Sequence, residues 1–187
     1  MKKYILLALL LAIPSLAQAG MMEDVKWAAF GGANYTTFST NVSGTSASSD
    51  LGFMLGGAGM LPLDRQQGIV VGLSWAMKNG KWTASGTEKK LQTNYIEVPV
   101  LYHYMINESW GVHGGVYGSY LLSSTLAGVN NKSSMSSIDY GITAGVGYMY
   151  QNWLFGAGYS LGLKDVDGSS NESKVSGFTA KVGYLFM

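Results

Sequence analysis

The stretch Asn94-Tyr95-Ile96-Glu97-Val98-Pro99-Val100-Leu101-Tyr102-His103-Tyr104 decides the fold of this chain. Every second residue from Ile96 to Tyr104 is apolar or aromatic, whereas the alternate residues are mixed and include the carboxylate of Glu97. Because side chains alternate between the two faces of a strand, this period of two predicts a β-strand with one apolar and one mixed face. A soluble protein buries its apolar face, whereas a membrane barrel turns that face toward lipid.

The same alternation recurs in eight segments, each about 10–13 residues long, which suits a tilted membrane strand better than the shorter strand of a soluble sheet. The predicted strands are Val25–Phe38, Leu51–Leu61, Gly68–Lys78, Asn94–Tyr104, Trp110–Leu122, Ile138–Tyr150, Trp153–Leu163 and Ser176–Met187.

Short and long connections alternate between these strands. The short turns are Pro62–Gln67, Met105–Ser109 and Gln151-Asn152. The long polar loops are Ser39–Asp50, Asn79–Lys90, Ser123–Ser137 and Lys164–Val175. This alternation is typical of outer-membrane barrels, in which the short turns are periplasmic and the longer loops are extracellular.

On the apolar face, aromatic residues gather near both ends of the predicted strands. Such girdles mark the two membrane interfaces, with Val, Leu, Ile, Ala and Gly between them. The girdle at the short turns comprises Trp27, Tyr104, Trp110, Tyr150, Trp153, Tyr184 and Phe186, and the girdle at the long loops comprises Tyr35, Phe53, Trp75, Tyr120, Tyr140, Tyr159 and Phe178.

The opposite parity is mostly glycine, serine and threonine and is expected to line the interior. An eight-stranded barrel is only wide enough for side chains to fill it, so the sequence predicts an interior plugged by its few large residues. These are Tyr95, Glu97, Leu101, His103, His113, Tyr117 and Lys181.

Two hairpins allow a register to be predicted. The turn Gln151-Asn152 pairs Tyr150 with Trp153, Tyr148 with Phe155 and Thr143 with Ser160. A symmetric turn at Met105–Ser109 pairs Tyr104 with Trp110, Glu97 with Tyr117 and Pro99 with Gly115. Since proline lacks the N–H that a closed barrel needs, we expect a local bulge at Pro99, opposite Gly115.

Three inward residues are candidates for chemistry. Glu97 is the one carboxylate deep in a predicted strand, and we expect Tyr117 and Lys181 to compensate its charge. A structural plug is the simpler reading, and a general acid or proton path is the alternative. His103 and His113 are expected as diagonal neighbours near the short turns, but no third metal ligand of suitable spacing accompanies them.

The composition and the absence of motifs exclude several functions. Charged residues make up 12% and 26 of 187 residues are glycine, about half and twice the usual shares. The chain has no cysteine, and its net charge of +1 gives no indication of nucleic-acid binding. No nucleophile elbow, phosphate loop or zinc-protease motif occurs, so we predict no enzyme activity and no catalytic, cofactor-binding or metal residues.

The first residues are typical of a secretory signal peptide. Met1-Lys2-Lys3 is basic, Tyr4–Ile13 is apolar, and Ala17-Gln18-Ala19 fits a cleavage site. We expect residues 1–19 to be the signal peptide and residues 20–187 to form one barrel domain.

Several motifs resemble the PorT-type outer membrane protein beta-barrel domain family over nearly the whole mature chain. The resemblance implies an eight-stranded outer-membrane barrel and carries over no catalytic residue. The motifs are Gly32-Ala33-Asn34-Tyr35-Thr36, Asn94-Tyr95-Ile96-Glu97-Val98-Pro99, Asp139-Tyr140-Gly141, Gly145-Val146-Gly147-Tyr148 and Tyr159-Ser160-Leu161-Gly162-Leu163.

The C-terminal residues Lys181-Val182-Gly183-Tyr184-Leu185-Phe186 resemble the signal that barrel-assembly machinery recognises, although Met187 stands where an aromatic residue is usual. We therefore expect three kinds of contact: outer-membrane lipid, this machinery, and an unidentified extracellular ligand at the loops. We also expect a monomer that binds no nucleic acid.

The sequence thus predicts a closed, antiparallel, eight-stranded transmembrane β-barrel in the outer membrane, with a non-enzymatic envelope or loop-mediated binding role. The alternatives are a lipid-modifying barrel enzyme, and a soluble secreted barrel that carries a small apolar ligand with its apolar parity turned inward.

Overall fold

A computed structural model describes residues 25–39, 45–84, 87–166 and 173–186. The predicted signal peptide, residues 1–19, lies outside these described residues. Among the described residues, no helix has the length and apolar character needed to cross a membrane.

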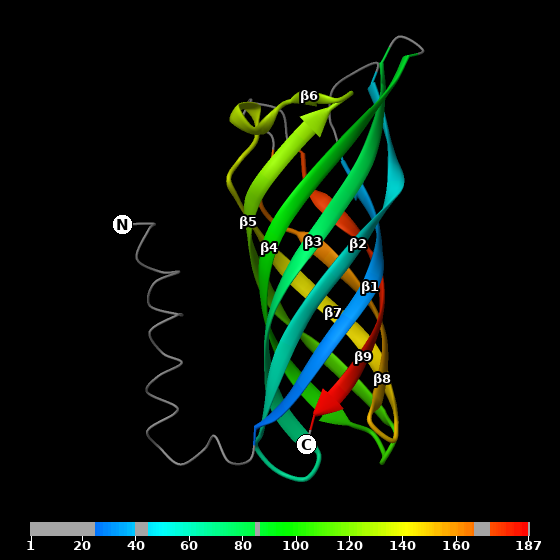
Figure 1. The fold of residues 1–187 in the computed structure, drawn as a ribbon, viewed down its shortest axis with the longest axis vertical. Coiled ribbons are helices and arrows are strands. Elements are labelled where there is room, and N and C mark those ends of the chain that lie inside the picture. Colours follow the sequence, from blue (N-terminus) through cyan, green and yellow to red (C-terminus); the bar gives the residue numbers. More distant parts are fainter. Residues whose placement is uncertain (1–24, 40–44, 85–86, 167–172, 187) are drawn as a thin grey trace, which may run out of the picture.

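Eight long strands form one antiparallel sheet that closes on itself. Around the ring the order is β4-β3-β2-β1-β9-β8-β7-β5, and pairing between β4 and β5 completes the barrel (Figure 1). The strands are β1 (Lys26–Phe38), β2 (Thr45–Pro62), β3 (Gln67–Ala84), β4 (Thr87–Met105), β5 (Trp110–Leu126), β7 (Ile138–Tyr150), β8 (Trp153–Gly162) and β9 (Val175–Phe186); the short β6 (Val129–Asn130) and the 3-10 turn η1 (Lys132–Ser134) lie between β5 and β7.

Four neighbouring strands, β2 to β5, are longer than the sequence pattern predicts. β3 and β4 stay paired as far as Ala84 and Thr87, so the predicted long loop Asn79–Lys90 is wrong. The predicted loop Ser123–Ser137 likewise contains the end of β5, the strand β6 and η1. Backbone hydrogen bonds hold these extensions together without an apolar stripe, which is why the hydrophobic pattern does not reveal them.

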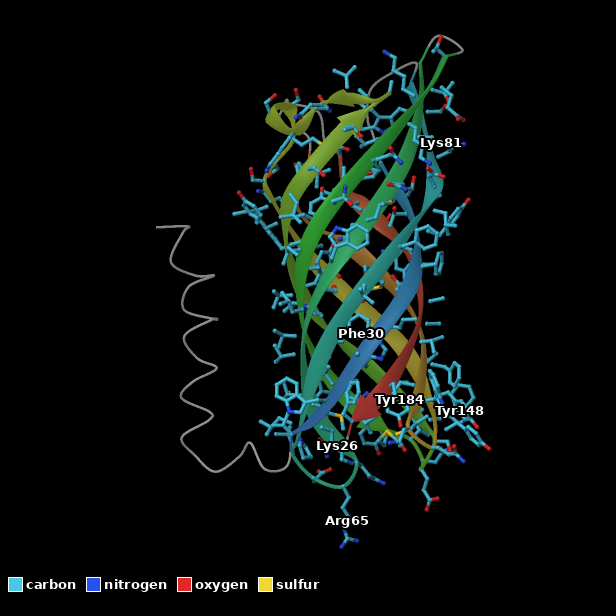
Figure 2. All side chains as sticks on the ribbon, in the orientation of Figure 1. Lys26, Phe30, Arg65, Lys81, Tyr148 and Tyr184 are labelled. Carbon is cyan, nitrogen blue, oxygen red and sulfur yellow. The ribbon has the colours of Figure 1, made fainter. Side chains whose placement is uncertain are left out.

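The apolar parity faces outward, as the membrane interpretation requires. Val116, Val146 and Val182 are all about half exposed, whereas the inward Tyr95 is fully buried. The residues of both aromatic girdles are exposed too, and Figure 2 shows Tyr184 of the short-turn girdle just above the charged Lys26 and Arg65. The alternative of a soluble barrel with its apolar parity inward is therefore wrong.

Polar side chains fold back onto the short turns and fix them. Asp64 Oδ1 accepts hydrogen bonds from the backbone N–H groups of Gln66 and Gln67 at 2.7 and 2.8 Å. Asn107 Oδ1 accepts in the same way from Ser109 and Trp110 at 2.9 and 2.8 Å. Such turns, formed by Asp or Asn side chains, are compact and place β2–β3 and β4–β5 side by side.

One predicted register is confirmed and the other is wrong by two residues. β7 and β8 pair Tyr150 with Trp153 and Thr143 with Ser160, as expected. In β4–β5, Tyr104 pairs with Val112 and Glu97 with Ser119, because the Asn107 turn draws Ile106 and Trp110 into the hairpin. A shift of two residues leaves every side chain on its predicted face.

Pro99 is accommodated without the predicted bulge. It pairs with Tyr117 rather than Gly115, and the β3–β4 register is the same on both sides of it, from Val71–Val100 to Ser74–Glu97. The proline ring instead lies close to Gly72, whose absent side chain leaves the room it needs. The bulge in this hairpin lies nearer the long-loop end, at Asn94/Tyr95.

Candidate functional site

The interior of the barrel is divided into layers along its axis. Glycines on the inner parity leave space for large side chains that reach in from other strands. A Cβ atom added to Gly141, for example, would lie 2.8 Å from the ring of Tyr117. The candidate site is therefore the stack of side chains between the two ends, together with the rim at the long-loop end.

A charged cluster occupies the middle of this stack. Lys78 of β3 is buried, and its ammonium lies 2.6 Å from Glu97 Oε2 on β4 and 3.6 Å from Asp139 Oδ2 on β7. The same ammonium lies 5.2 Å from the centre of the Tyr95 ring and 4.6 Å from that of Tyr117. Since β3 and β7 are separated by β4 and β5 around the ring, this cluster ties together strands that are not neighbours in the sheet.

The partners that we predicted for Glu97 are wrong. Its ion pair is with Lys78 and not Lys181, and Tyr117 donates a hydrogen bond to Asp139 Oδ2 at 3.4 Å instead. Glu97 is also not alone, because Asp139 is a second deep carboxylate with no exposed surface. The inner parity of Gly72, Ser74 and Ala76 continues to Lys78, and that continuation is the signal that could have identified it.

An apolar cluster lies between this charged cluster and the long-loop end. Its members come from four strands and from two segments outside the long strands, and Trp82 and Leu126 pack against them. The cluster consists of Phe38, Leu91, Tyr95, Leu121, Met135, Val166 and Val175. Tyr95 belongs to both clusters, so the apolar and charged layers are in direct contact.

The half of the interior nearer the short turns is less densely bonded. His103 and His113 pair directly across β4 and β5, with nearly parallel rings 6.5 Å apart, rather than diagonally as predicted. His103 Nε2 lies 3.1 Å from Met105 Sδ. Lys181 points over the Phe30 ring at 5.7 Å. Among the described residues, no group of three or more His, Cys, Asp or Glu side chains could hold a metal ion.

The rim at the long-loop end carries ion pairs on the extended strands. Lys81 lies 3.1 Å from Glu88 across β3 and β4, and Lys90 lies 2.9 Å from Asp50 of β2. Figure 2 shows Lys81 high on this end of the barrel. Burial raises the pKa of the Asp50 carboxyl, but its hydrogen bond and charge interaction with Lys90 outweigh burial and hold that pKa below its usual value.

Comparisons with known proteins agree with this geometry. The family model described as outer membrane protein beta-barrel domain matches residues 16–168. Among curated proteins, none matches the chain significantly.

Solved structures share the fold at low sequence identity. Ail, the attachment invasion locus protein of Yersinia pestis, solved with the heparin analogue sucrose octasulfate, is 16% identical with a TM-score of 0.55, and the match covers 87% of this chain and 99% of Ail. Neisserial surface protein A is 16% identical with a TM-score of 0.57, and the match covers 86% of this chain and 97% of that protein. OprG from Pseudomonas aeruginosa is 16% identical with a TM-score of 0.53, and the match covers 87% of this chain and 95% of OprG.

Proposed function

Because the chain belongs to the outer membrane protein beta-barrel domain family, and is therefore an integral protein of the outer membrane, we propose that it acts through its extracellular face while side chains close its interior. The extracellular face is the long-loop end, and the short turns are periplasmic.

The observation that carries this proposal is the ion cluster of Lys78, Glu97 and Asp139 across the middle of the barrel. A continuous water path along the axis would have to pass this cluster and then the apolar cluster above it. Eight strands leave little interior room beyond what such side chains occupy. The extended, paired strands β2 to β5 support a role for the extracellular face, because they carry polar side chains beyond the outer aromatic girdle.

Conductance of the purified protein in planar lipid bilayers tests the closed interior. We expect the wild-type protein to give no steady conductance above the lipid baseline. The variant Lys78→Ser, which removes the cation that links β3 to β7, should conduct more often than wild type. A stable, ohmic wild-type channel that Lys78→Ser leaves unchanged would overturn the proposal.

We also propose that the protein is not an enzyme. His103 and His113 lie near the periplasmic end, away from the extracellular loops, and the close side-chain neighbour of His103 Nε2 is the thioether of Met105. The rival function is a lipid-modifying barrel that uses a histidine-activated serine. Outer-membrane acyl chains should be the same in cells that express wild type and His103→Ala/His113→Ala; a difference in acyl composition would favour the enzyme.

The partners in this proposal follow from the surface. The exposed apolar belt contacts lipid, the C-terminal strand β9 is read by the barrel-assembly machinery, and the extracellular loops bind an unidentified ligand. The chain acts as a monomer, since its ring of strands closes without a second copy. A closer relation to PorT-type barrels rests on the motif Asn94–Pro99, and the matched family model supports only the broader family.

A further inference from the structure

A cavity of about 220 Å³ lies at the extracellular mouth, between η1 and the wall formed by β3 and β5. Its apolar lining consists of Trp82, Leu126, Met135 and Val166. Asn131 and Ser134, beside and within η1, add polar groups, and Ser173 closes the cavity from the β9 side. No charged side chain is among its lining residues in the described part of the chain. The cavity thus favours a neutral occupant that combines an apolar body with a polar group.

Two polar atoms in this lining are buried without a partner among the described residues. They are the indole Nε1 of Trp82 and the hydroxyl Oγ of Ser173, and Ser173 is 2% exposed. A buried donor or hydroxyl without a hydrogen bond is costly, so each such group in a folded protein calls for an explanation. Both line the same cavity, so a hydroxyl-bearing molecule bound there would offer them hydrogen-bond partners.

Trp82 differs from the other four tryptophans of the chain. Trp27, Trp75, Trp110 and Trp153 are all exposed on the outer wall. Trp82 lies on the inner parity and packs against the apolar cluster. An indole beneath the extracellular loops, with its N–H unpaired, is typical of a binding pocket, where a few polar groups orient a mostly apolar ligand.

We propose that this cavity binds a small neutral molecule with a compact apolar body and one oxygen, such as an alcohol. The oxygen accepts a hydrogen bond from Trp82 Nε1 and exchanges one with Ser173 Oγ, while the apolar body packs on Met135 and Val166. At about 30 Å³ for a water-sized group, the volume admits about seven non-hydrogen atoms. The inference rests on the proposed function and makes its ligand-binding part specific.

Binding here does not imply passage through the barrel. The floor of the cavity belongs to the apolar cluster, since Met135 and Val166 are members of both, and the Lys78 cluster lies beyond it. The site therefore captures its ligand from the outside.

Titration of a single-tryptophan protein tests the inference. Trp27, Trp75, Trp110 and Trp153 are replaced by phenylalanine, and the remaining Trp82 is followed by fluorescence in lipid nanodiscs. The probe is cyclohexanol, which has about seven non-hydrogen atoms, and the matched probe without oxygen is methylcyclohexane. A second protein that retains only the outward Trp75 reports partition of the probe into lipid.

We expect a saturable change at Trp82 with cyclohexanol and only a linear change at Trp75. Methylcyclohexane should bind more weakly. Ser173→Ala should lower the affinity for cyclohexanol by about 2- to 10-fold, which corresponds to the loss of one hydrogen bond. Met135→Phe, which narrows the cavity without adding a tryptophan, should weaken or abolish saturation. The same linear response at Trp82 and Trp75 would overturn the inference, as would saturation that Ser173→Ala and Met135→Phe leave unchanged.

Two controls keep the outcome decisive. If the four-fold variant does not fold, the difference spectrum between wild type and Trp82→Phe supplies the same signal. The bilayer conductance of wild type is independent of this titration. If the barrel does not conduct and Trp82 does not respond, only the binding proposal is overturned. If the barrel conducts, the proposal of a closed interior is overturned.

Discussion

The two lysines that point into the barrel, the buried Lys78 and the partly exposed Lys181, show how differently its halves are built. In the extracellular half, Lys78 bridges two carboxylates from different strands and faces two tyrosine rings. In the periplasmic half, Lys181 contacts the Phe30 ring, and no carboxylate oxygen in the described part of the chain lies within 4.0 Å of its ammonium.

The difference teaches that charge is arranged by layer. The cluster around Lys78 carries one formal positive and two negative charges, so it has a net charge of −1. Lys181 supplies the remaining positive charge from below, and the four interior charges then sum to zero. The extracellular half contains specific ion pairs, whereas in the described periplasmic half Lys181 packs over an aromatic ring without an ion pair.

The largest expected effect comes from Lys78→Met. This change leaves Glu97 and Asp139 close together and without a cation, and breaking a buried pair in this way costs about 3–5 kcal/mol in the free energy of unfolding. Urea unfolding in lipid vesicles, followed by tryptophan fluorescence, measures the loss.

The matched control for Lys78→Met removes all three charges together. Lys78→Met/Glu97→Gln/Asp139→Asn should recover most of the lost stability, because no unpaired charge then remains buried. A triple variant no more stable than the single one would mean that the ion cluster is not what holds this half together.

Glycine substitutions should be most costly where the added Cβ atom meets backbone, as at Gly141, and less costly where it meets a flexible side chain, as at Gly156. A Cβ atom at Gly141 would lie 2.2 Å from the carbonyl oxygen of Leu161 and 2.8 Å from the Tyr117 ring. A Cβ atom at Gly156 meets only the flexible chain of Lys181, at 3.0 Å. We expect Gly141→Ala to destabilise by about 1–3 kcal/mol and Gly156→Ala by less than about 1 kcal/mol.

The heat-modifiable gel mobility of Gly141→Ala and Gly156→Ala gives their unfolding temperatures. The outward Gly118 is the control, since a Cβ atom there meets nothing within 4 Å. Equal losses at Gly141 and Gly156 would show that backbone and side-chain neighbours of the added Cβ atom cost the same.

Lys181→Met should change stability little. The substitution removes a charge without a close carboxylate and keeps most of the apolar chain, so we expect a change within about 1 kcal/mol, including a small gain. The same urea unfolding measures it. A loss as large as that of Lys78→Met would show that Lys181 has a partner as important as those of Lys78.

The pair Asp50–Lys90 at the rim should give the smallest effect, because its lysine is half exposed whereas Lys78 is buried. The pKa of Asp50 in the folded protein lies below its ordinary value of 3.8, so its contribution is present above that value and is lost as the pH falls through the lowered pKa. We expect about 0.5 kcal/mol or less, because Lys90 is half exposed.

Amide hydrogen exchange of the β3–β4 extension measures this loss between pH 6 and 3, after correction for the intrinsic rate. Lys90→Gln is the control, and its protection should respond less to pH in this window, because only the interactions of Lys81 with Asp50 and Glu88 then remain. A pH response that is the same in wild type and Lys90→Gln would contradict the role of the pair.

The sequence by itself determined the barrel, its orientation to lipid and its outer girdles. Alternation along strands such as Ile96–Tyr104 specifies which side chains share a face, and this depends only on the geometry of a strand. The β7–β8 register was also predictable, since a two-residue turn fixes it. The predicted face of each residue was correct even where the β4–β5 register was wrong, because a shift of two residues does not change the face of a side chain.

Only the tertiary structure decided which interior side chains meet. Lys78 and Asp139 lie on strands separated by β4 and β5. Their contact depends on the combined register of several strand pairs. One compact turn, such as that of Asn107, shifts every pair of its hairpin. The paired extension of β3 and β4, which turns Trp82 inward, rests on backbone hydrogen bonds between polar residues. Backbone pairing leaves no periodic mark in the side chains, so the mouth and its cavity could be seen only in three dimensions.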